Sequence, residues 1–511
     1  MNLWKRPFDA GKLEESQSSQ KRAAAPRSPK DTSLSTDVLL LTAMLCFAAL
    51  SGIRLLNDHC TWADDWAQYL LQARSLGDGS TADCVSRNAF MMHNSVRQDG
   101  PDVYPWGLPV LLAGEARLFS FDLMTFKRIN VVFFALVALV TWMLAQQFTT
   151  GRGALVATSL IAFNPLLAHY SNHILSELPF AFFSVAALVT AGRALQSRPL
   201  RIWPPLLAGG LAAVAFTMRT SGILLLPALM FSQAMASREE SRSRRAAALL
   251  TPCLAFAVFA VVWEGLFPGG GTAYGRMLSH ISVQTIVSNA MTYPIALFDL
   301  FTGGRLSGVA AMVLAPLIIC GAASCLVRSA HLSCYFLLTL ALYIVWPEQG
   351  QGYRFMIPLA PLSALFLVLG FQAAAANIAP RFKYASLLKA VPAVMSAVML
   401  ASSLFFIVTQ KASRDSWHPF DSESTELFRW VRANTPPEAV FSFFKPRAFH
   451  FFTRRLCLTS DPDDLRNASY FIYTKESPWN DSQQRLAVYS ARAKLTLCFQ
   501  NRDYRLFRVE H

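Results

Sequence analysis

Long apolar segments recur along this chain, and they constrain its fold more than any other feature. They begin at residue 36 and continue to residue 410, and each is close to the roughly 20 residues that an α-helix needs to cross a bilayer. Only 15% of the 511 residues are charged, and the mean hydropathy is +0.33. Soluble proteins have about 25% charged residues. The sequence therefore predicts a mainly α-helical, polytopic membrane protein.

About eleven of these segments are predicted to span the membrane. The stretch 202–236 counts as two of them, because it is too long for one crossing at about 1.5 Å per residue and because Arg219 interrupts it. The predicted spans are 36–57, 129–148, 153–171, 174–194, 203–217, 221–236, 247–267, 306–327, 331–346, 354–376 and 388–410.

The basic residues set the predicted orientation. The formal net charge is +14, and Lys and Arg gather in short loops between apolar segments, which is typical of cytoplasmic loops. Residues 1–35 are interpreted as a disordered, basic, cytoplasmic tail, which places the first outer loop (58–126) and the C-terminus outside. No nucleic-acid-binding signature accompanies the charge, so we expect no nucleic acid partner. Frequent Ala and Arg favour a bacterial inner membrane with a periplasmic outer side.

The same charge rule assigns two further segments to the outer side. If 105–121 crossed the membrane, every later loop would invert, and three basic clusters would lie outside. We therefore expect a re-entrant or surface-lying helix at 105–121. Residues 268–304 are expected to form a Gly-rich outer loop.

Residues 411–511 differ in character from the transmembrane domain at 36–410. Helices are predicted before Pro436–Pro437 and near 462–467 and 481–493, and strands at 439–444, 469–474, 494–499 and 504–509. This pattern indicates a small extracytoplasmic α/β domain. Four cysteines lie in predicted outer regions, where disulfides can form, and the pairs Cys60–Cys84 and Cys457–Cys498 are a hypothesis.

The stretch from Cys60 to Leu76 carries the first candidates for chemistry. Asp64 and Asp65 are adjacent carboxylates at the start of an amphipathic segment that follows the first span. An interfacial helix with its apolar stripe in lipid would hold this acidic pair at the membrane surface, facing water. Helix capping is the alternative explanation of Asp at this position. Such a pair suits chemistry on a lipid-linked substrate.

Further ionisable residues lie near the predicted outer ends of spans. His173 and Glu177 belong to the loop between the third and fourth spans, and ionisable residues at such depth are more often functional. Arg219 and Arg354 also lie at outer span ends, where snorkelling to the headgroups is the alternative explanation. A carboxylate can act as a general base, and a guanidinium group can hold a phosphate through two hydrogen bonds.

Together these segments resemble the GT-C type, polyprenyl-phosphate-dependent membrane glycosyltransferases. This superfamily includes dolichyl-phosphate-mannose protein mannosyltransferases and lipid A aminoarabinose transferases. The matching segments are Asp64-Asp65 with Ala73-Arg74-Ser75-Leu76, Tyr104-Pro105-Trp106-Gly107-Leu108-Pro109, Leu175-Ser176-Glu177-Leu178-Pro179-Phe180, Arg219-Thr220-Ser221-Gly222, and Tyr353-Arg354-Phe355 followed by Pro358. Their order and spacing extend the resemblance over nearly the whole chain.

The resemblance implies an inverting transfer of a sugar from a polyprenyl-phosphate donor to an acceptor hydroxyl on the extracytoplasmic face. The catalytic base then falls on Asp64, with Asp65 as its neighbour. Arg354 and Arg219 would stabilise the leaving phosphate, and Glu177 would position the acceptor or a divalent metal ion. The candidate substrate-binding residues are Glu177, Arg219, Arg354, Tyr104 and His173.

Two departures from the family pattern leave the subfamily open. Tyr104-Pro105-Trp106 stands where the aminoarabinose transferases have Lys-Pro-Pro, so a different donor is expected. The large insertion of the protein mannosyltransferases has no counterpart between 268 and 304. The sugar, the acceptor (lipid, glycan or protein) and metal dependence stay open.

Two other function classes remain as alternatives. A multi-pass transporter or lipid flippase usually has internal repeats and ionisable residues near mid-membrane, whereas this sequence has no evident repeat. A non-catalytic membrane scaffold is the third class. The substitution Asp64→Asn would separate a scaffold from an enzyme, because only the enzyme would lose activity.

Overall fold

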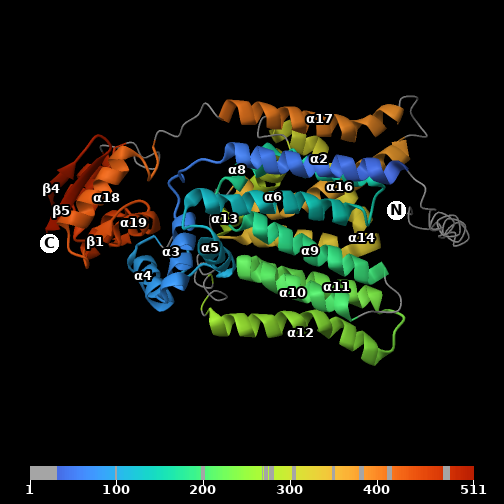
Figure 1. Ribbon diagram of the computed structural model, residues 1–511, viewed down its shortest axis with the longest axis horizontal. Helices are drawn as coiled ribbons and strands as arrows, with labels where there is room; N and C mark the ends of the chain where they lie inside the picture. Colours follow the sequence, from blue (N-terminus) through green and yellow to red (C-terminus); the bar gives the residue numbers. More distant parts are fainter. Residues whose placement is uncertain are drawn as a thin grey trace, which may run out of the picture.

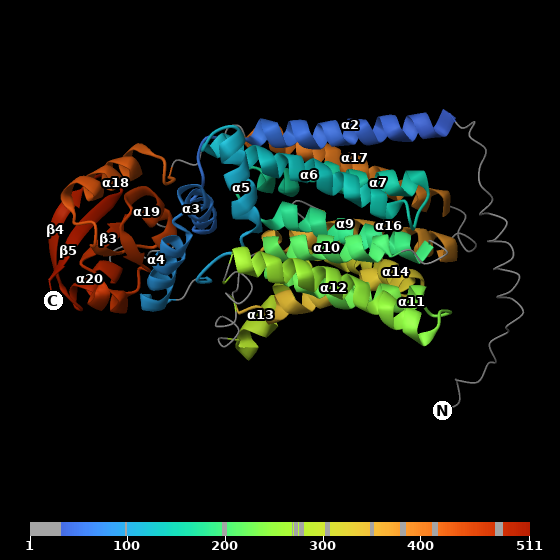
Figure 2. The ribbon, with the colours of Figure 1, turned by 60° about the horizontal axis from the view of Figure 1, so that its bottom comes forward.

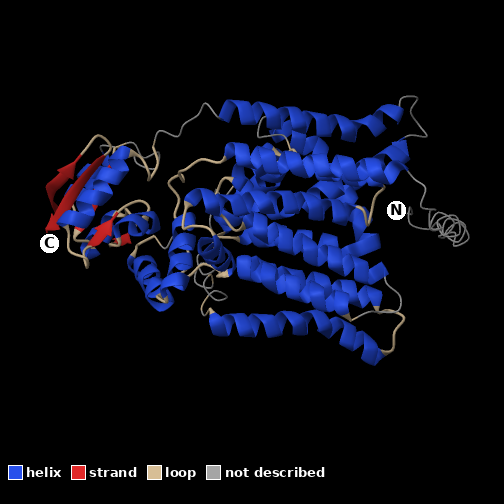
Figure 3. Ribbon diagram, viewed as in Figure 1, coloured by secondary structure: helices blue, strands red, loops and turns tan. Residues whose placement is uncertain are grey.

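The computed structural model describes residues 32–97, 100–196, 202–267, 269, 274, 281–301, 307–347, 352–378, 385–410, 417–475 and 484–510. Most helices lie side by side in an elongated bundle (Figure 1). A C-terminal domain, whose described residues are 417–475 and 484–510, lies at one end of the bundle and contains every described strand (Figure 3). Three helices from segment 58–126 lie between the two parts (Figure 2).

The bundle consists of α-helices joined in places by short 3₁₀ turns. Its elements are α2 (Thr32–Leu55), α6 (Leu123–Ala145), α7 (Gly151–Ala162), α8 (Pro165–Ser171), α9 (Glu177–Gln196), α10 (Trp203–Met218), η1 (Thr220–Leu224), α11 (Leu225–Ala236), α12 (Arg242–Leu266), α13 (Val283–Asp299), α14 (Ser307–Val345), α15 (Tyr353–Met356), η3 (Ile357–Leu359), α16 (Ala360–Ile378) and α17 (Ala385–Gln410). Non-helical backbone at Ser329 divides α14 into two parts.

The helices agree with the predicted spans in position. Within the described residues, six are long and apolar enough to cross a membrane, and the pair α7–α8, bent by 53°, could form a seventh span. Four shorter apolar helices cover the remaining predicted segments: Trp203–Met218, Thr220–Ala236, Met312–Leu326 and Ser329–Val345. Each predicted span therefore coincides with apolar helix, while the number that cross stays a prediction.

The predicted outer loop at 268–304 contains a helix, α13, which packs against α14. The glycines at 269–271 suggested a loop, but the buried residues of α13, among them Thr285, Asn289, Tyr293 and Ala296, recur at helical spacing. The prediction of a loop is therefore wrong for 283–299. Of the rest, 268, 270–273, 275–280 and 302–304 lie outside the described residues.

Helix α16 is the centre of the bundle, since 89% of its apolar window is buried. It packs so closely on α14 that a Cβ at Gly321 would overlap the carbonyl oxygen of Phe366, and a Cβ at Gly370 would overlap that of Leu317. Small residues allow helix backbones to approach in this way where lipid supplies no hydrophobic driving force. This contact fixes α16, and with it the segment 353–359 that leads into it.

Helices α3 (Asp65–Asp78), α4 (Thr81–Asn94) and α5 (Gly107–Leu118) link the bundle to the C-terminal domain. At 12 residues, α5 is about 18 Å long and too short to cross a bilayer. The stripe of α3 that was expected to face lipid is buried inside the protein. Trp66, for example, packs on Phe420, Phe451 and Phe452 of the C-terminal domain. The prediction of a lipid-facing stripe is therefore wrong, because the C-terminal domain and the neighbouring helix α5 cover it.

The C-terminal domain is a five-stranded sheet with helices, close to the predicted α/β pattern. Its elements are α18 (Ser422–Asn434), β1 (Val440–Ser442), α19 (Pro446–Thr453), β2 (Leu456–Leu458), η5 (Pro462–Asn467), β3 (Tyr470–Thr474), α20 (Gln484–Ser490), β4 (Lys494–Gln500) and β5 (Tyr504–Glu510). The strand order is β2-β1-β3-β5-β4, with parallel pairing around β1 and antiparallel pairing of β5 with β3 and β4. Only α19 and β2 were not predicted.

All nine cysteines are free, so neither hypothetical disulfide forms. Cys457 is on β2 and Cys498 on β4, which are the two edge strands of the sheet. Four strand spacings separate them by roughly 19 Å, whereas a disulfide requires Cα atoms within about 7 Å. Cys60 and Cys84 line two different cavities.

Candidate active site

The acidic pair, Asp64 and Asp65, lies where the bundle meets the C-terminal domain. Asp64 is at the N-cap position of α3, but its side chain makes no capping hydrogen bond. Its Oδ1 instead accepts hydrogen bonds from the backbone N–H groups of Arg447 (3.1 Å) and Ala448 (3.2 Å), at the start of α19. Burial raises the pKa of Asp64, and the nearby charges of Lys445 and Arg447 oppose this rise. Helix capping therefore does not explain this carboxylate.

Asp65 is held by different partners. Its Oδ1 accepts a 2.5 Å hydrogen bond from the Tyr104 hydroxyl, and its Oδ2 lies 2.5 Å from Nη1 of Arg354. Burial opposes ionisation of Asp65, but Arg354 and Tyr104 outweigh it and hold the pKa of this carboxyl at about 2. Two adjacent carboxylates whose pKa values are driven apart suit different roles, an ionised anchor and a proton acceptor.

Asp65 is the end of a buried ion network that continues into the bundle. Glu177, at the first position of α9, has only 2% of its side chain exposed. Its Oε1 accepts hydrogen bonds from Nη1 of Arg219 (2.6 Å) and from Nε of Arg354. Two carboxylates and two guanidinium groups therefore balance in charge, as buried charges require. The structure thus brings Asp65, Glu177, Arg219 and Arg354 into direct contact, while their roles stay a prediction.

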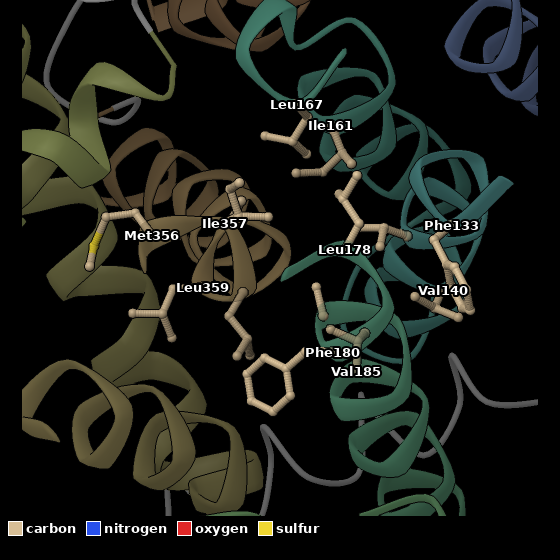
Figure 4. Close-up of a cluster of buried hydrophobic side chains, with 14 of the residues drawn as sticks. Phe133, Val140, Ile161, Leu167, Leu178, Phe180, Val185, Met356, Ile357 and Leu359 are labelled. Atoms are coloured by element: carbon tan, nitrogen blue, oxygen red, sulfur yellow. The ribbon is translucent and has the colours of Figure 1, made fainter. Parts of the chain in front are cut away.

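Apolar packing holds the segments that carry Glu177 and Arg354 next to each other. Figure 4 shows Leu178 and Phe180, which follow Glu177 on α9, on the side of Ile357 and Leu359 of η3, which follow Arg354. All four side chains are buried, and α9 packs against η3. The elements that carry Glu177 and Arg354 are thus joined by a dry contact directly next to the ion pair.

Sequence reasoning did not single out Arg447. The side chain is 1% exposed, and it donates hydrogen bonds to Asn88 Oδ1 (2.8 Å), the Pro101 carbonyl (2.9 Å) and the Tyr104 hydroxyl (3.1 Å). The available signal was Pro446, which is favoured at the first position of a helix such as α19. Nothing in the local sequence indicates that this helix meets Asp64.

A cavity of about 330 Å³ opens beside the acidic pair. The ends of α2, α8 and α17 and the loop before α3 form its wall. Ala63 and Trp66, which flank the acidic pair, also line it. The polar residues of its lining are Arg54, Asn57, Asp58, His59, Cys60, Thr61, His169, Asn172, His173, Arg354 and Gln410. The cavity thus brings Arg354 and His173 to one space.

His173 stands apart from the ion network. Its Nδ1 lies 3.2 Å from the carbonyl oxygen of His169, and burial lowers the pKa of this imidazole to about 3, so it is neutral near pH 7. Among the predicted site residues, Asp65, Tyr104, Glu177, Arg219 and Arg354 form one chain of contacts. Asp64 adjoins this chain on the side of the C-terminal domain, and His173 shares only the cavity wall with Arg354.

In the part of the chain that the structure describes, no three His, Cys, Asp or Glu side chains are grouped so that they could hold a metal ion. Glu177 is engaged by two arginines instead. The residues described do not fit the metal role considered for Glu177, and no step proposed below passes through a metal.

The chain was compared with protein families and with curated protein sequences. Residues 102–263, which include Tyr104, Glu177 and Arg219, match the family model described as dolichyl-phosphate-mannose-protein mannosyltransferase. No curated protein sequence matches the chain.

Solved structures match over most of the chain. The fold is similar to that of ArnT from Cupriavidus metallidurans in the apo state, with a TM-score of 0.60 and 11% identity, covering 93% of this chain and 98% of that chain. ArnT bound to undecaprenyl phosphate gives a TM-score of 0.57 at 10% identity, covering 92% and 97%. The archaeal oligosaccharyltransferase AglB from Archaeoglobus fulgidus, in complex with an inhibitory peptide and a dolichol-phosphate, gives 0.51 at 14% identity, covering 85% and 69%.

These matches confirm the resemblance noted from the sequence motifs. The chain has the fold of the GT-C type membrane glycosyltransferases, and its residues 102–263 match the family of dolichyl-phosphate-mannose-protein mannosyltransferases.

Proposed function

We propose that this protein is an integral membrane glycosyltransferase that moves a hexose or pentose from a polyprenyl-phosphate donor to an acceptor hydroxyl or similar nucleophile. One observation carries the proposal: Arg354 lines the cavity and also binds Asp65 of the acidic pair directly, so a carboxylate pair and a phosphate-binding group meet at one space. The fold supports it, because structures of this fold include one with undecaprenyl phosphate and one with a dolichol-phosphate.

Asp64 is the general base in this proposal. Backbone N–H groups hold its Oδ1, and no residue within the described ranges donates a hydrogen bond to Oδ2. As the acceptor oxygen bonds to the anomeric carbon, its proton passes to Oδ2. The bond between the anomeric carbon and the phosphate oxygen breaks, and its electron pair leaves with the polyprenyl phosphate. Attack from the face opposite the leaving group inverts the configuration.

Arg354 stabilises the leaving phosphate. Its Nε and Nη1 bind Glu177 and Asp65, and the other N–H groups of its guanidinium are the donors for a phosphate in the cavity that this residue lines. Because the charges of the ion network already balance, a further positive charge is needed for a phosphate, and Arg54 supplies it from the same cavity. Arg219 acts through Glu177, which it holds in place. Tyr104 orients Asp65, and neutral His173 offers a hydrogen bond to the sugar.

The donor enters from the lipid phase. The outer ends of α2 and α17 contribute Leu55, Ile407 and Gln410 to the cavity wall. Only 22% and 11% of the apolar windows of these two helices are buried, so their remaining surface suits contact with a prenyl chain. Residues 36–410 form the transmembrane domain, with the tail 1–35 in the cytoplasm and 411–511 in the periplasm of a bacterial inner membrane. The acceptor is a lipid, glycan or protein on that outer side.

The test is sugar release from membranes that contain the protein and retain its acceptor, supplied with a panel of undecaprenyl- and dolichyl-phosphate sugars. Wild type should consume one donor, and Asp64→Asn should reduce turnover by about 10²- to 10⁴-fold, the usual contribution of a general base. Asp78→Asn is the matched control, because it removes an exposed carboxylate from the other end of α3. If wild type consumes no donor, or if Asp64→Asn is as active as Asp78→Asn, the proposal fails, and lipid transport is measured next.

A further inference from the structure

Arg447 connects the C-terminal domain to both members of the acidic pair. Its backbone N–H binds Asp64, and its guanidinium group donates to the hydroxyl of Tyr104, which in turn donates to Asp65. The guanidinium carbon also lies 5.0 Å from the centre of the Tyr104 ring. One residue of a separate domain thus reaches both carboxylates, one directly and one through a tyrosine.

We propose that Arg447 is a positioning residue for the acidic pair, so that the C-terminal domain completes the active site instead of merely covering it. This inference rests on the proposed function and adds to it a residue outside the transmembrane domain. Arg447 touches neither substrate nor reacting atoms in this proposal. Its backbone N–H holds Oδ1 of Asp64, and its side chain fixes the position of Asp65 through Tyr104.

The loop before α5 shows why the side chain is needed. Arg447 binds the carbonyl of Pro101 and the amide of Asn88, and the chain at Gly100 lies so close that a Cβ there would meet the guanidinium group. Tyr104 is a few residues further on. A planar guanidinium group with several fixed donors can order such a loop, which a single-point cation cannot do.

Arg455, another buried arginine of the C-terminal domain, differs from Arg447 in the location of its hydrogen-bond partners. Arg455 is 9% exposed and donates to Thr435 and to the carbonyl of Arg432, all within the C-terminal domain. Its contacts stabilise that domain alone. A residue that only maintained the domain would make its hydrogen bonds within it, as Arg455 does, whereas the side-chain hydrogen bonds of Arg447 to Asn88, Pro101 and Tyr104 reach segment 58–126.

Removal of Arg447 should also change the ionisation of Asp64. The charged and titratable groups that face Asp64 are Lys445, which precedes α19, Arg447 on α19, the thiol of Cys457 on β2, and Asp65 on α3. The positive charges of Lys445 and Arg447 both favour the ionised form of Asp64. Without Arg447 the pKa of Asp64 rises, and the base becomes available only at higher pH.

The experiment compares Arg447→Gln, Arg447→Lys and Arg455→Gln in the sugar-release assay over a range of pH. Arg447→Gln should lower kcat by about 10- to 100-fold, the effect of losing charge-assisted hydrogen bonds, and should move the acidic limb of the kcat profile to higher pH. Arg447→Lys should return that limb towards wild type but recover only part of kcat. Arg455→Gln should keep the wild-type profile.

Hydrogen exchange provides a readout that is independent of activity. In Arg447→Gln, the backbone amides at 100–104 should exchange faster than in wild type, whereas in Arg455→Gln they should not. The inference is overturned if Arg447→Gln keeps the wild-type pH profile, or if both variants lose activity in parallel with thermal stability. If wild type transfers no sugar, the proposed function fails instead, and unchanged exchange at 100–104 then overturns the positioning role by itself.

Discussion

The two sides of the acidic pair are built from different interactions. On the bundle side, Asp65 and Glu177 face Arg354 and Arg219, so full charges compensate full charges in a buried space. On the side of the C-terminal domain, Asp64 is bound by backbone N–H groups. If one charged residue on the bundle side is removed, its oppositely charged partner stays buried without a counter-charge. The neutral backbone N–H groups that bind Asp64 carry no charge that would be left unpaired in this way. The bundle side thus contributes more to stability, and the domain side contributes more to orientation.

The largest effect is expected from Glu177→Gln, which leaves Arg354 and Arg219 with one carboxylate between them. Breaking a buried ion pair by removing one partner costs about 3–5 kcal/mol, so the free energy of unfolding should fall by that order. Thermal unfolding in detergent measures it. The control is Glu240→Gln, which removes the partner of Arg244 in a mostly exposed pair and should change stability by about 0–1 kcal/mol. A small effect of Glu177→Gln would contradict the assignment of stability to the bundle side.

Asp65→Asn should have the next largest effect, and a clear pH dependence. The pKa of Asp65 is about 2 in the folded protein, below its unfolded value near 3.8, so its ionisation stabilises the fold. This contribution, about 2 kcal/mol, is complete above pH 4 and is lost as the pH falls towards 2. Unfolding followed from pH 6 to pH 2 should show this loss in wild type but not in Asp65→Asn. Parallel curves for the two proteins would refute it.

Tyr104→Phe tests the link between the two sides. It removes one hydroxyl that donates to Asp65 and accepts from Arg447, so the free energy of unfolding should fall by about 1–3 kcal/mol, the cost of leaving a buried charged partner unsatisfied. Turnover should fall more than donor affinity, since the hydroxyl orients carboxylates instead of binding the donor. A rise in KM with an unchanged kcat would instead place Tyr104 in donor binding.

Asp64→Asn should change stability least while reducing turnover most. The pKa of Asp64 is raised in the folded protein, so its ionisation costs stability as the pH rises through that pKa. A neutral Asn avoids this cost and still accepts hydrogen bonds from Arg447 and Ala448. Its free energy of unfolding at pH 7 should equal or slightly exceed that of wild type. Destabilisation comparable to that of Asp65→Asn would remove the distinction between the two carboxylates.

The helices of the bundle could be predicted from the sequence, because the length and apolar composition of each segment indicate by themselves that it is a buried or membrane-facing helix. Local periodicity and charge located the helices, and polar residues at span ends pointed to Glu177, Arg219 and Arg354. The same local signal failed for α3, since an apolar stripe looks alike whether lipid or protein covers it. Trp66 is covered by aromatic side chains more than 350 positions away in the sequence.

The domain side of the site could not be predicted from the sequence. Short elements such as α19 and β2, with eight and three residues, carry little periodicity. Arg447 is one arginine among many in a basic chain, and its role depends on a contact between distant segments. The pKa difference between Asp64 and Asp65 likewise arises from tertiary partners, so the local sequence does not indicate it, and only the family resemblance distinguished the two residues.

The contact between Asp64 and Arg447 joins residues 383 positions apart, and this separation has a consequence for biosynthesis. A growing chain presents its N-terminal part first. Asp64 is made early, whereas α19 emerges only after the last apolar helix, α17. A nascent chain that is still inserting its helices therefore lacks the backbone N–H groups that hold Asp64. Under the proposed function, turnover would begin only after α19 has been made and the C-terminal domain has folded onto the bundle.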